Sequence, residues 1–221
     1  MGDNVDLSIE DIKERAIQNF GAQNRAVTEQ DYEALCYLMP AKFGSVKRAR
    51  ICKDPMSVRK NMNIYVLTEN VDGTLTAPNN ILKNNLKTWI TKSKMINDTI
   101  DILDGRVVNF GINFSISVED GYESADVLSK CLTRLRSLYD RKVAHIGEDF
   151  SITEIYQVLN DVEGVSDTVN VAVNNKTGGV YSGTFLDIEK YTSRDGRMIN
   201  IPKNVAYEIK VPEADIRGSV V

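Results

Sequence analysis

The sequence contains few cysteines and a single histidine. Its three cysteines are Cys36, Cys52 and Cys131, an odd number without a Cys-x-x-Cys spacing, so it indicates neither a disulfide framework nor a zinc site. His145 is the only histidine. A site with several histidines is therefore excluded, and a Ser-His-Asp or Cys-His site would have to use this one residue. We expect reduced, mostly buried thiols, which suit a protein made in a reducing cytoplasm.

Long hydrophobic runs are also missing. No apolar stretch approaches the ~20 residues that span a bilayer, and the acidic start M-G-D-N-V-D-L lacks the apolar region of a secretory signal. Hydrophobic residues make up 42% and charged residues 26% of the 221 residues, the composition of a soluble globular protein. The net charge of −4 argues against a general nucleic-acid binder. We expect no membrane partner.

No catalytic or cofactor-binding signature is present. Neighbouring carboxylates occur at Glu119-Asp120 and Glu148-Asp149, but nothing places them across a cleft as glycoside hydrolysis requires. Gly178-Gly179 lacks the G-x-x-x-x-G-K-S/T pattern of a phosphate loop and indicates a turn. We expect no catalytic residue, no cofactor and no metal ion, so a structural or interaction role is favoured over an enzyme.

The apolar spacing predicts an α+β fold. Helices are expected at residues 9–20, 28–39, 81–90 and 123–142 and from Ser151 to Gly164, and strands at 46–53, 61–68, 108–118, 165–173 and 205–211. We expect two small α/β sandwich (ferredoxin-like) units with antiparallel or mixed sheets. The predicted parts are an N-terminal helix and link (1–27), a first unit (28–118), a second unit (119–175) and a β-hairpin-rich C-terminal extension (176–221). Thr28 and Ser151 each open a capped helix that leads through a glycine step into a strand, which is a weak internal repeat.

The stretch from Gly21 to Leu35 joins two predicted helices. Thr28 stands at an N-cap position with Asp31 three residues later, so the hydroxyl can accept an N–H bond while the carboxylate reaches back. Tyr32 begins the apolar face of this helix, and Arg25 is a candidate for holding the link before it. We interpret Arg25, Thr28, Asp31 and Tyr32 as a structural motif.

Residues 42–60 carry the most uneven charge, with seven cations and one acidic residue, Asp54. Lys47, Arg48 and Arg50 lie on the strand expected at 46–53 and are candidates for a protein interface. Binding of nucleic acid through 42–60 remains an alternative, although no stacked aromatic residues alternate with these cations. The cations are Lys42, Lys47, Arg48, Arg50, Lys53, Arg59 and Lys60.

Three segments resemble the C-terminal part of the baseplate J-like family of contractile-tailed phages, and within it the baseplate wedge proteins of the T4-like type. They are S-I-E-D-I-K-E-R-A from Ser8, N-R-A-V-T-x-x-D-Y from Asn24 and F-G-S-V-K-R-A from Phe43. A strand N-I-Y-V-L, a helix and a long alternating strand follow in the order of the family. The resemblance covers residues 8 to 118 and extends to Val173 by element order.

The resemblance implies a non-enzymatic structural component of a tail baseplate wedge. Such proteins form homotypic contacts, expected here as a homodimer, and contacts with other wedge proteins in the baseplate ring during tail assembly and contraction. The implied location is the virion tail baseplate, assembled in the host cytoplasm. The N-terminal region of the family is absent from the sequence given, and residues after Asn174 match no quoted motif. A tail-associated cell-wall hydrolase is the alternative function.

Overall fold

A computed structural model describes residues 25–53, 61–70, 73–141 and 144–221, with side chains of 140 and 141 not described. The chain divides into two compact units, Met1–Gly105 (unit 1) and Arg106–Val221 (unit 2). Each unit has its own hydrophobic core. The helix predicted at 9–20, with its cap at Ser8, lies outside the described residues, as do Arg59 and Lys60.

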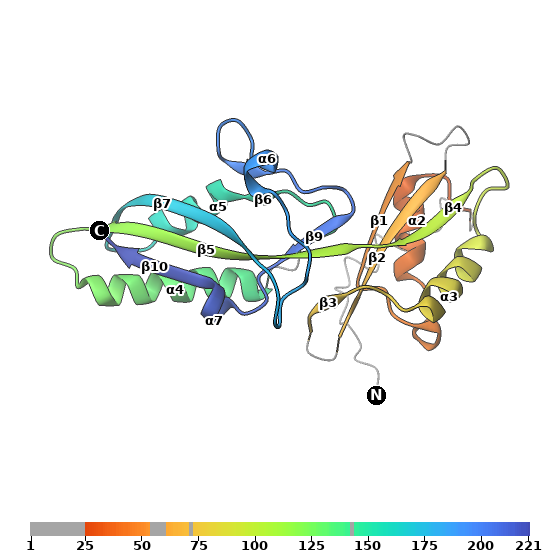
Figure 1. Cartoon of the computed structure of the whole chain (residues 1–221), viewed down its shortest axis with the longest axis horizontal. Helices are drawn as coiled ribbons and strands as arrows, with labels where there is room; N and C mark the ends of the chain where they lie inside the picture. The colour runs from red at the N-terminus through yellow and green to blue at the C-terminus, as the bar shows by residue number, and fades with distance from the viewer. Residues whose placement is uncertain (1–24, 54–60, 71–72, 142–143) are drawn as a thin grey trace. The chain divides into compact units, whose positions relative to one another are not determined.

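Unit 1 is a small mixed sheet with helices packed against one face (Figure 1). Its central strand β2 pairs antiparallel with β1 on one side, and on the other side parallel with β4 and antiparallel with the short β3. The elements are α2 (Glu29–Tyr37), the 3-10 helix η1 (Ala41–Phe43), β1 (Arg48–Lys53), β2 (Met62–Glu69), β3 (Leu75–Thr76), α3 (Asn80–Thr91) and β4 (Ile100–Asp104).

Alternation along the strands of unit 1 defines its two faces. Ile51 of β1, Ile64 of β2 and Ile100 of β4 are buried on the helical side, where Leu86 of α3 and Cys36 of α2 meet them. The intervening residues of each strand lie on the opposite face of the sheet, away from α2 and α3. Trp89 packs against this core and donates its Nε1–H to the carbonyl of Leu35 at 3.0 Å.

Unit 2 is organised around β5, the long strand drawn in green in Figure 1. β5 pairs antiparallel with β7 on one side and parallel with β9 and β10 on the other. The elements are β5 (Arg106–Val118), α4 (Ser124–Arg141), β6 (Phe150–Ser151), α5 (Ile152–Asn160), β7 (Val165–Lys176), α6 (Ile188–Tyr191), β8 (Met198–Ile199), β9 (Val205–Glu208), α7 (Pro212–Asp215) and β10 (Ile216–Val220).

The core of unit 2 lies between one face of β5 and two helices. Every second residue of β5 from Val108 to Ile116 is buried in one cluster with residues of α4 and α5, as the alternation predicts. Phe110 makes an edge-to-face contact with Phe150 at a centroid distance of 5.4 Å and stacks near Tyr207 of β9. This aromatic group packs one end of the core.

The polar face of β5 is covered at its N-terminal end by the segment 177–187. Ser182 donates its backbone N–H to Asn109 Oδ1 at 2.7 Å and its hydroxyl to the carbonyl of Val107 at 2.6 Å. Tyr181 donates its hydroxyl to the buried Asp215 at 2.6 Å. Asn109 is therefore buried on the side that the alternation alone assigns to solvent or a partner.

The residues after 176 differ from the expected hairpin-rich extension. β9 and β10 add to the sheet of unit 2 in parallel with β5, and β8 pairs with the distant β6. The expected boundary after Val118 also differs from the observed division at Gly105, because β5 pairs with strands that all follow it in the chain. Short strands carry no local signal for a parallel partner far away in sequence.

The internal repeat has a counterpart in the structure. In unit 1 the capped helix α2 leads through Gly44 into β1, and in unit 2 the capped helix α5 leads through Gly164 into β7. Both glycines have positive φ, 117° and 92°, a region that side-chain-bearing residues rarely adopt. Both strands pair antiparallel with the central strand of their sheet.

Candidate interaction surfaces

The capping box predicted at Thr28 is present. Thr28 Oγ1 accepts the N–H of Asp31 at 3.1 Å, and Asp31 Oδ2 accepts the N–H groups of Thr28 at 2.8 Å and Val27 at 3.0 Å. Burial pushes the pKa of Asp31 upward, but these backbone hydrogen bonds outweigh it, and the pKa lies below its ordinary value. The carboxylate is thus held in its charged form at the N-terminus of α2.

Tyr32 joins α2 to the turn before β4. Its side chain is fully buried, and its hydroxyl donates to Asp98 Oδ2 at 2.5 Å and accepts the N–H of Met95 at 3.3 Å. Burial and the bond to Asp98 raise the pKa of Tyr32 above its ordinary value. The link before α2 is held by the N–H of Ala26, which donates to the carbonyl of Ser93 at 2.9 Å. No hydrogen bond or ion pair joins Arg25, which is exposed, to another described residue.

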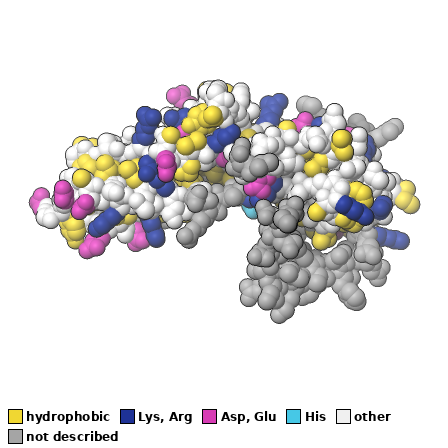
Figure 2. Space-filling model, turned by 90° about the horizontal axis from the view of Figure 1, so that it is seen from below, with side chains coloured by type: hydrophobic (Ala, Val, Ile, Leu, Met, Phe, Trp, Pro, Cys, Tyr) yellow, Lys and Arg dark blue, Asp and Glu magenta, His cyan; other side chains and the backbone are white. Residues whose placement is uncertain are grey.

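The cations of residues 42–53 do not form one surface. Lys47 pairs with Glu69, Lys53 pairs with Glu29 at 3.6 Å, and Lys42 lies over the ring of Phe43. Arg48 and Arg50 lie on the face of β1 that points away from α2 and α3. On the part of Figure 2 that shows unit 2, basic and acidic side chains are interspersed.

The open face of the sheet in unit 2 is polar and made of small side chains. Asn113 and Ser115 of β5 lie on it beside Arg217 and Ser219 of β10, their partners in the parallel register. The hydroxyls of Ser115 and Ser219 lie 3.0 Å apart, and Asn170 of β7 is opposite Ser115. This surface suits a broad contact and offers no group with an unusual reactivity.

The outer edge of β1 is blocked by side chains of α2. The N–H of Ala49 donates to the hydroxyl of Tyr37 at 3.0 Å, and the N–H of Ile51 donates to Glu33 Oε1 at 3.2 Å. In unit 2 the N–H of Val171 in β7 donates to the hydroxyl of Tyr156 in the same way, at 3.2 Å. Occupied donors cannot pair with a further strand, so these bonds protect two sheet edges.

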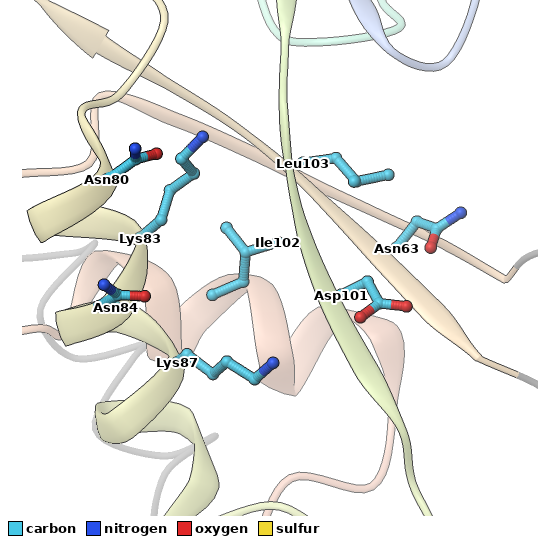
Figure 3. Close-up of a pocket in the computed structure, with 8 residues that line it drawn as sticks. All are labelled: Asn63, Asn80, Lys83, Asn84, Lys87, Asp101, Ile102 and Leu103. Atoms are coloured by element: carbon cyan, nitrogen blue, oxygen red, sulfur yellow. The ribbon is translucent and has the colours of Figure 1, made fainter.

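A polar groove of about 620 Å³ runs between α3 and β4. In Figure 3, Lys83 and Lys87 extend from α3 toward β4, Ile102 points into the space between helix and strand, and Asp101 points away from α3. Lys83 binds Asp104 at 3.0 Å, whereas no described residue pairs with Lys87. This groove was not predicted from the sequence. A signal existed, because Asn80, Lys83, Asn84 and Lys87 recur at spacings of three and four on one polar helix face.

The residues considered for chemistry serve structural purposes. His145 is exposed, and its backbone N–H donates to Glu148 Oε2 at 2.8 Å; Asp149 Oδ1 accepts the N–H of Ile201 at 2.9 Å. Cys36 and Cys131 are buried, and burial raises the pKa of the Cys36 thiol to about 12. Within residues 25–53, 61–70, 73–141 and 144–221, no cluster of His, Cys, Asp and Glu could hold a metal ion. None of the helices in these ranges is long and apolar enough to cross a membrane.

The described residues therefore define a two-unit α+β protein whose notable features are a polar sheet face in unit 2, protected edges of β1 and β7 and a groove beside α3. Its fold resembles one chain in the cryo-EM structure of the six-fold symmetrised baseplate of the anti-feeding prophage. The TM-score is 0.54 with 10% sequence identity, over 99% of this chain and 43% of that chain. At this identity the likeness shows a shared fold, and this chain spans less than half the length of that one.

No model of a known protein family matches the sequence, and no curated protein matches it. Membership of the baseplate J-like family therefore stays a prediction.

Proposed function

We propose that the protein is a structural, non-enzymatic component of the baseplate of a contractile-tail particle. The observation that carries the proposal is the fold shared with a baseplate chain over 99% of this sequence. The motifs at Asn24–Tyr32 and Phe43–Ala49 support the same class independently, because they resemble baseplate wedge proteins without reference to the fold.

The distribution of side chains supports assembly over catalysis. The carboxylates of Glu148 and Asp149 bind backbone N–H groups, so they are already used in holding a loop. The open face of the sheet in unit 2 instead offers an area of polar side chains. Large contacts of this kind are what a ring component needs, since specific interfaces bury on the order of 1,600 Å².

The finer proposal is a wedge protein of the T4-like type in the virion tail, assembled in the host cytoplasm. It would pair with a second copy and with other wedge proteins. Lys47, Arg48 and Arg50 are the proposed interface cations; Lys47 pairs with Glu69, and Arg48 donates a hydrogen bond to the carbonyl of Lys47. Within the motif, Thr28, Asp31 and Tyr32 are proposed to hold the helix orientation that these contacts require, whereas Arg25 has no hydrogen bond or ion pair to another described residue.

The test is the location of the protein in intact particles. An affinity-tagged chain, expressed in cells that carry its gene, is expected to co-purify with the particles, and immunogold label should lie at the baseplate end of the tail. Deletion of the gene should yield tails that lack complete baseplates in negative-stain images. Absence of the chain from purified particles, or label spread along the tail, would count against the proposal.

A further inference from the structure

The free edge of β4 presents backbone groups that no described residue binds. The carbonyl of Thr99 accepts the N–H of Met62 at 2.8 Å, and the N–H of Gly105 donates to Val66 at 3.0 Å. In a parallel pair, residues bonded to the neighbour alternate with residues whose groups point outward. Ile100, Ile102 and Asp104 therefore direct their N–H and C=O groups away from β2, where no hydrogen bond to a described residue meets them.

This edge differs from that of β1 in the same sheet. There Tyr37 and Glu33 occupy the outward N–H groups of Ala49 and Ile51, whereas the edge of β4 adjoins the groove beside α3 instead of a capping side chain. Unprotected edges pair readily with added strands, and proteins block those that have no use. Of these two edges of the sheet, the β4 edge is therefore the one that can pair with an added strand.

The side chains that line the groove determine which residues of an added strand would fit there. Lys83 and Lys87 lie on the α3 side, and Lys87 has no ion-pair partner among the described residues. A second hollow of about 280 Å³ adjoins the groove at Lys87 and is lined by Lys94 as well as by Asp98 and Asp101. An extended segment beside β4 would point alternate side chains toward these lysines. Acidic residues at every second position fit that face, while small or β-branched residues fit the other, near Asp101 and Leu103.

We infer that the β4 edge and its groove bind an extended segment of another protein that carries acidic residues at alternate positions, added to the sheet as a further strand. A second copy of this chain fits less well. Symmetric pairing of two β4 edges would place Lys83 and Lys87 of each copy opposite those of the other, and like charges would oppose it. The inference rests on the proposed assembly role, since it names one partner contact of the baseplate component.

The first test is peptide binding to the full chain, followed by fluorescence anisotropy. The probe is a labelled ten-residue peptide that alternates glutamate and threonine, and saturable binding is expected; a lysine–threonine peptide of equal length should not bind. Two further probes carry N-methyl groups, either on the glutamates or on the threonines. Because successive N–H groups of a strand point to opposite sides, only one set can face β4. One methylated peptide should lose affinity by about tenfold or more, and the other should keep it.

The second test uses matched charge reversals. Lys87→Glu should weaken binding of the acidic peptide about tenfold, whereas Lys92→Glu, an exposed lysine just past the end of α3 that does not line the groove, should change it little. Equal losses from both variants, equal losses from both methylated peptides, or no saturable binding would each overturn the inference. So would a dimer in sedimentation that Lys87→Glu strengthens, because that result assigns the edge to a second copy.

Failure of this inference is distinguishable from failure of the proposed function. If the chain is found at the baseplate of intact particles but does not bind the peptide, the proposed assembly role stands and the proposed β4 site is refuted. If the chain binds the peptide with the expected pattern but is absent from particles, the β4 site stands and the proposed baseplate role is refuted.

Discussion

The side chain of Tyr32 connects α2 to the turn before β4. Its hydroxyl satisfies both Asp98 and the N–H of Met95 in a buried position, so it spans 66 residues of sequence with two hydrogen bonds. Asp98 stands just before β4, and the turn that it closes therefore sets where that strand begins. Stability of this contact is measurable because Trp89, the only tryptophan, reports on unit 1 alone.

Tyr32→Phe should lower the free energy of unfolding of unit 1 by about 1.5 kcal/mol, because a buried hydrogen bond to a carboxylate is lost while the ring stays packed. The measurement is a urea titration followed by Trp89 fluorescence. Tyr65→Phe is the control, since Tyr65 lies on the face of β2 that points away from α2 and α3, and its hydroxyl makes no hydrogen bond to another described residue. Equal shifts for both variants would contradict the role of the Tyr32 hydroxyl.

Asp31 should make the stability of unit 1 depend on pH. Its folded-state pKa is lowered, so its contribution is fully present above the unfolded-state value of about 3.9 and is lost as pH falls through the folded-state value. Asp31→Asn should therefore cost roughly 0.5–1 kcal/mol at pH 7 and progressively less below pH 4. Urea midpoints of both proteins from pH 7 to 2.5 test this, and a constant difference would be inconsistent with it.

At the scale of single residues, the sequence predicts hydrogen bonds between residues a few positions apart. It does not predict bonds between residues far apart in the chain. The cap of Thr28 and Asp31 depends on residues three apart, and the sequence predicts it. The bond from Tyr32 to Asp98, the tie of Ala26 to Ser93 and the pairing of Lys47 with Glu69 depend on the fold, and no local pattern announces them.

Among the elements, β1 shows how an edge strand of this protein is kept from pairing. Glu33 and Tyr37 lie one helical turn apart on α2, so both reach the strand from the same side and bind its alternate N–H groups. The bonds add to stability and also remove a template for aggregation.

The double variant Glu33→Ala, Tyr37→Phe should destabilise unit 1 by about 1–2 kcal/mol, since two buried backbone donors lose their acceptors. It should also associate with increasing concentration through the exposed β1 edge. Light scattering across a concentration series measures the second effect. Glu29→Ala removes only an exposed ion pair with Lys53 and should behave as the unchanged protein; association of both variants would argue against edge protection.

β10 depends on the absence of a side chain at Gly218. A Cβ atom there would lie 2.4 Å from Phe114 and 2.7 Å from Leu128 of α4, so the helix could not keep its distance from the sheet. Gly218→Ala should lower the free energy of unfolding of unit 2 by about 1–3 kcal/mol. Far-UV circular dichroism in urea checks this, with Gly183→Ala as control because nothing lies within 4 Å of that position. Equal stability of the two variants would refute the packing argument.

The elements themselves were largely predictable, and their partners were not. Helices α3, α4 and α5 and strands β2, β5 and β7 follow from period and caps, because each signal lies within the element. Parallel pairing of β9 and β10 with β5 does not, since the register joins residues about 100 positions apart. For the groove beside α3, the sequence shows only a polar face of the helix. It does not indicate that β4 lies opposite this face.

For the whole molecule, the two cores have no residue in common. The free energies that hold them are therefore expected to be separable, and the chain should not unfold as one two-state system. Gly218→Ala offers the test: the transition seen by circular dichroism should gain an earlier component, while the transition seen by Trp89 fluorescence keeps its midpoint. A Trp89 midpoint that moves by the same amount would show that the units unfold together.

Gly105 alone separates the last residue of β4 from the first residue of β5. A pull along the chain at this point acts directly on β5, which pairs with β9 at its start and with β7 and β10 over most of the rest of its length. Because those bonds run across the strand axis, the load falls on many of them in shear rather than opening them one after another. Under such a load, unit 2 would hold the chain in place, and unit 1, attached through the edge strand of its sheet, would yield first.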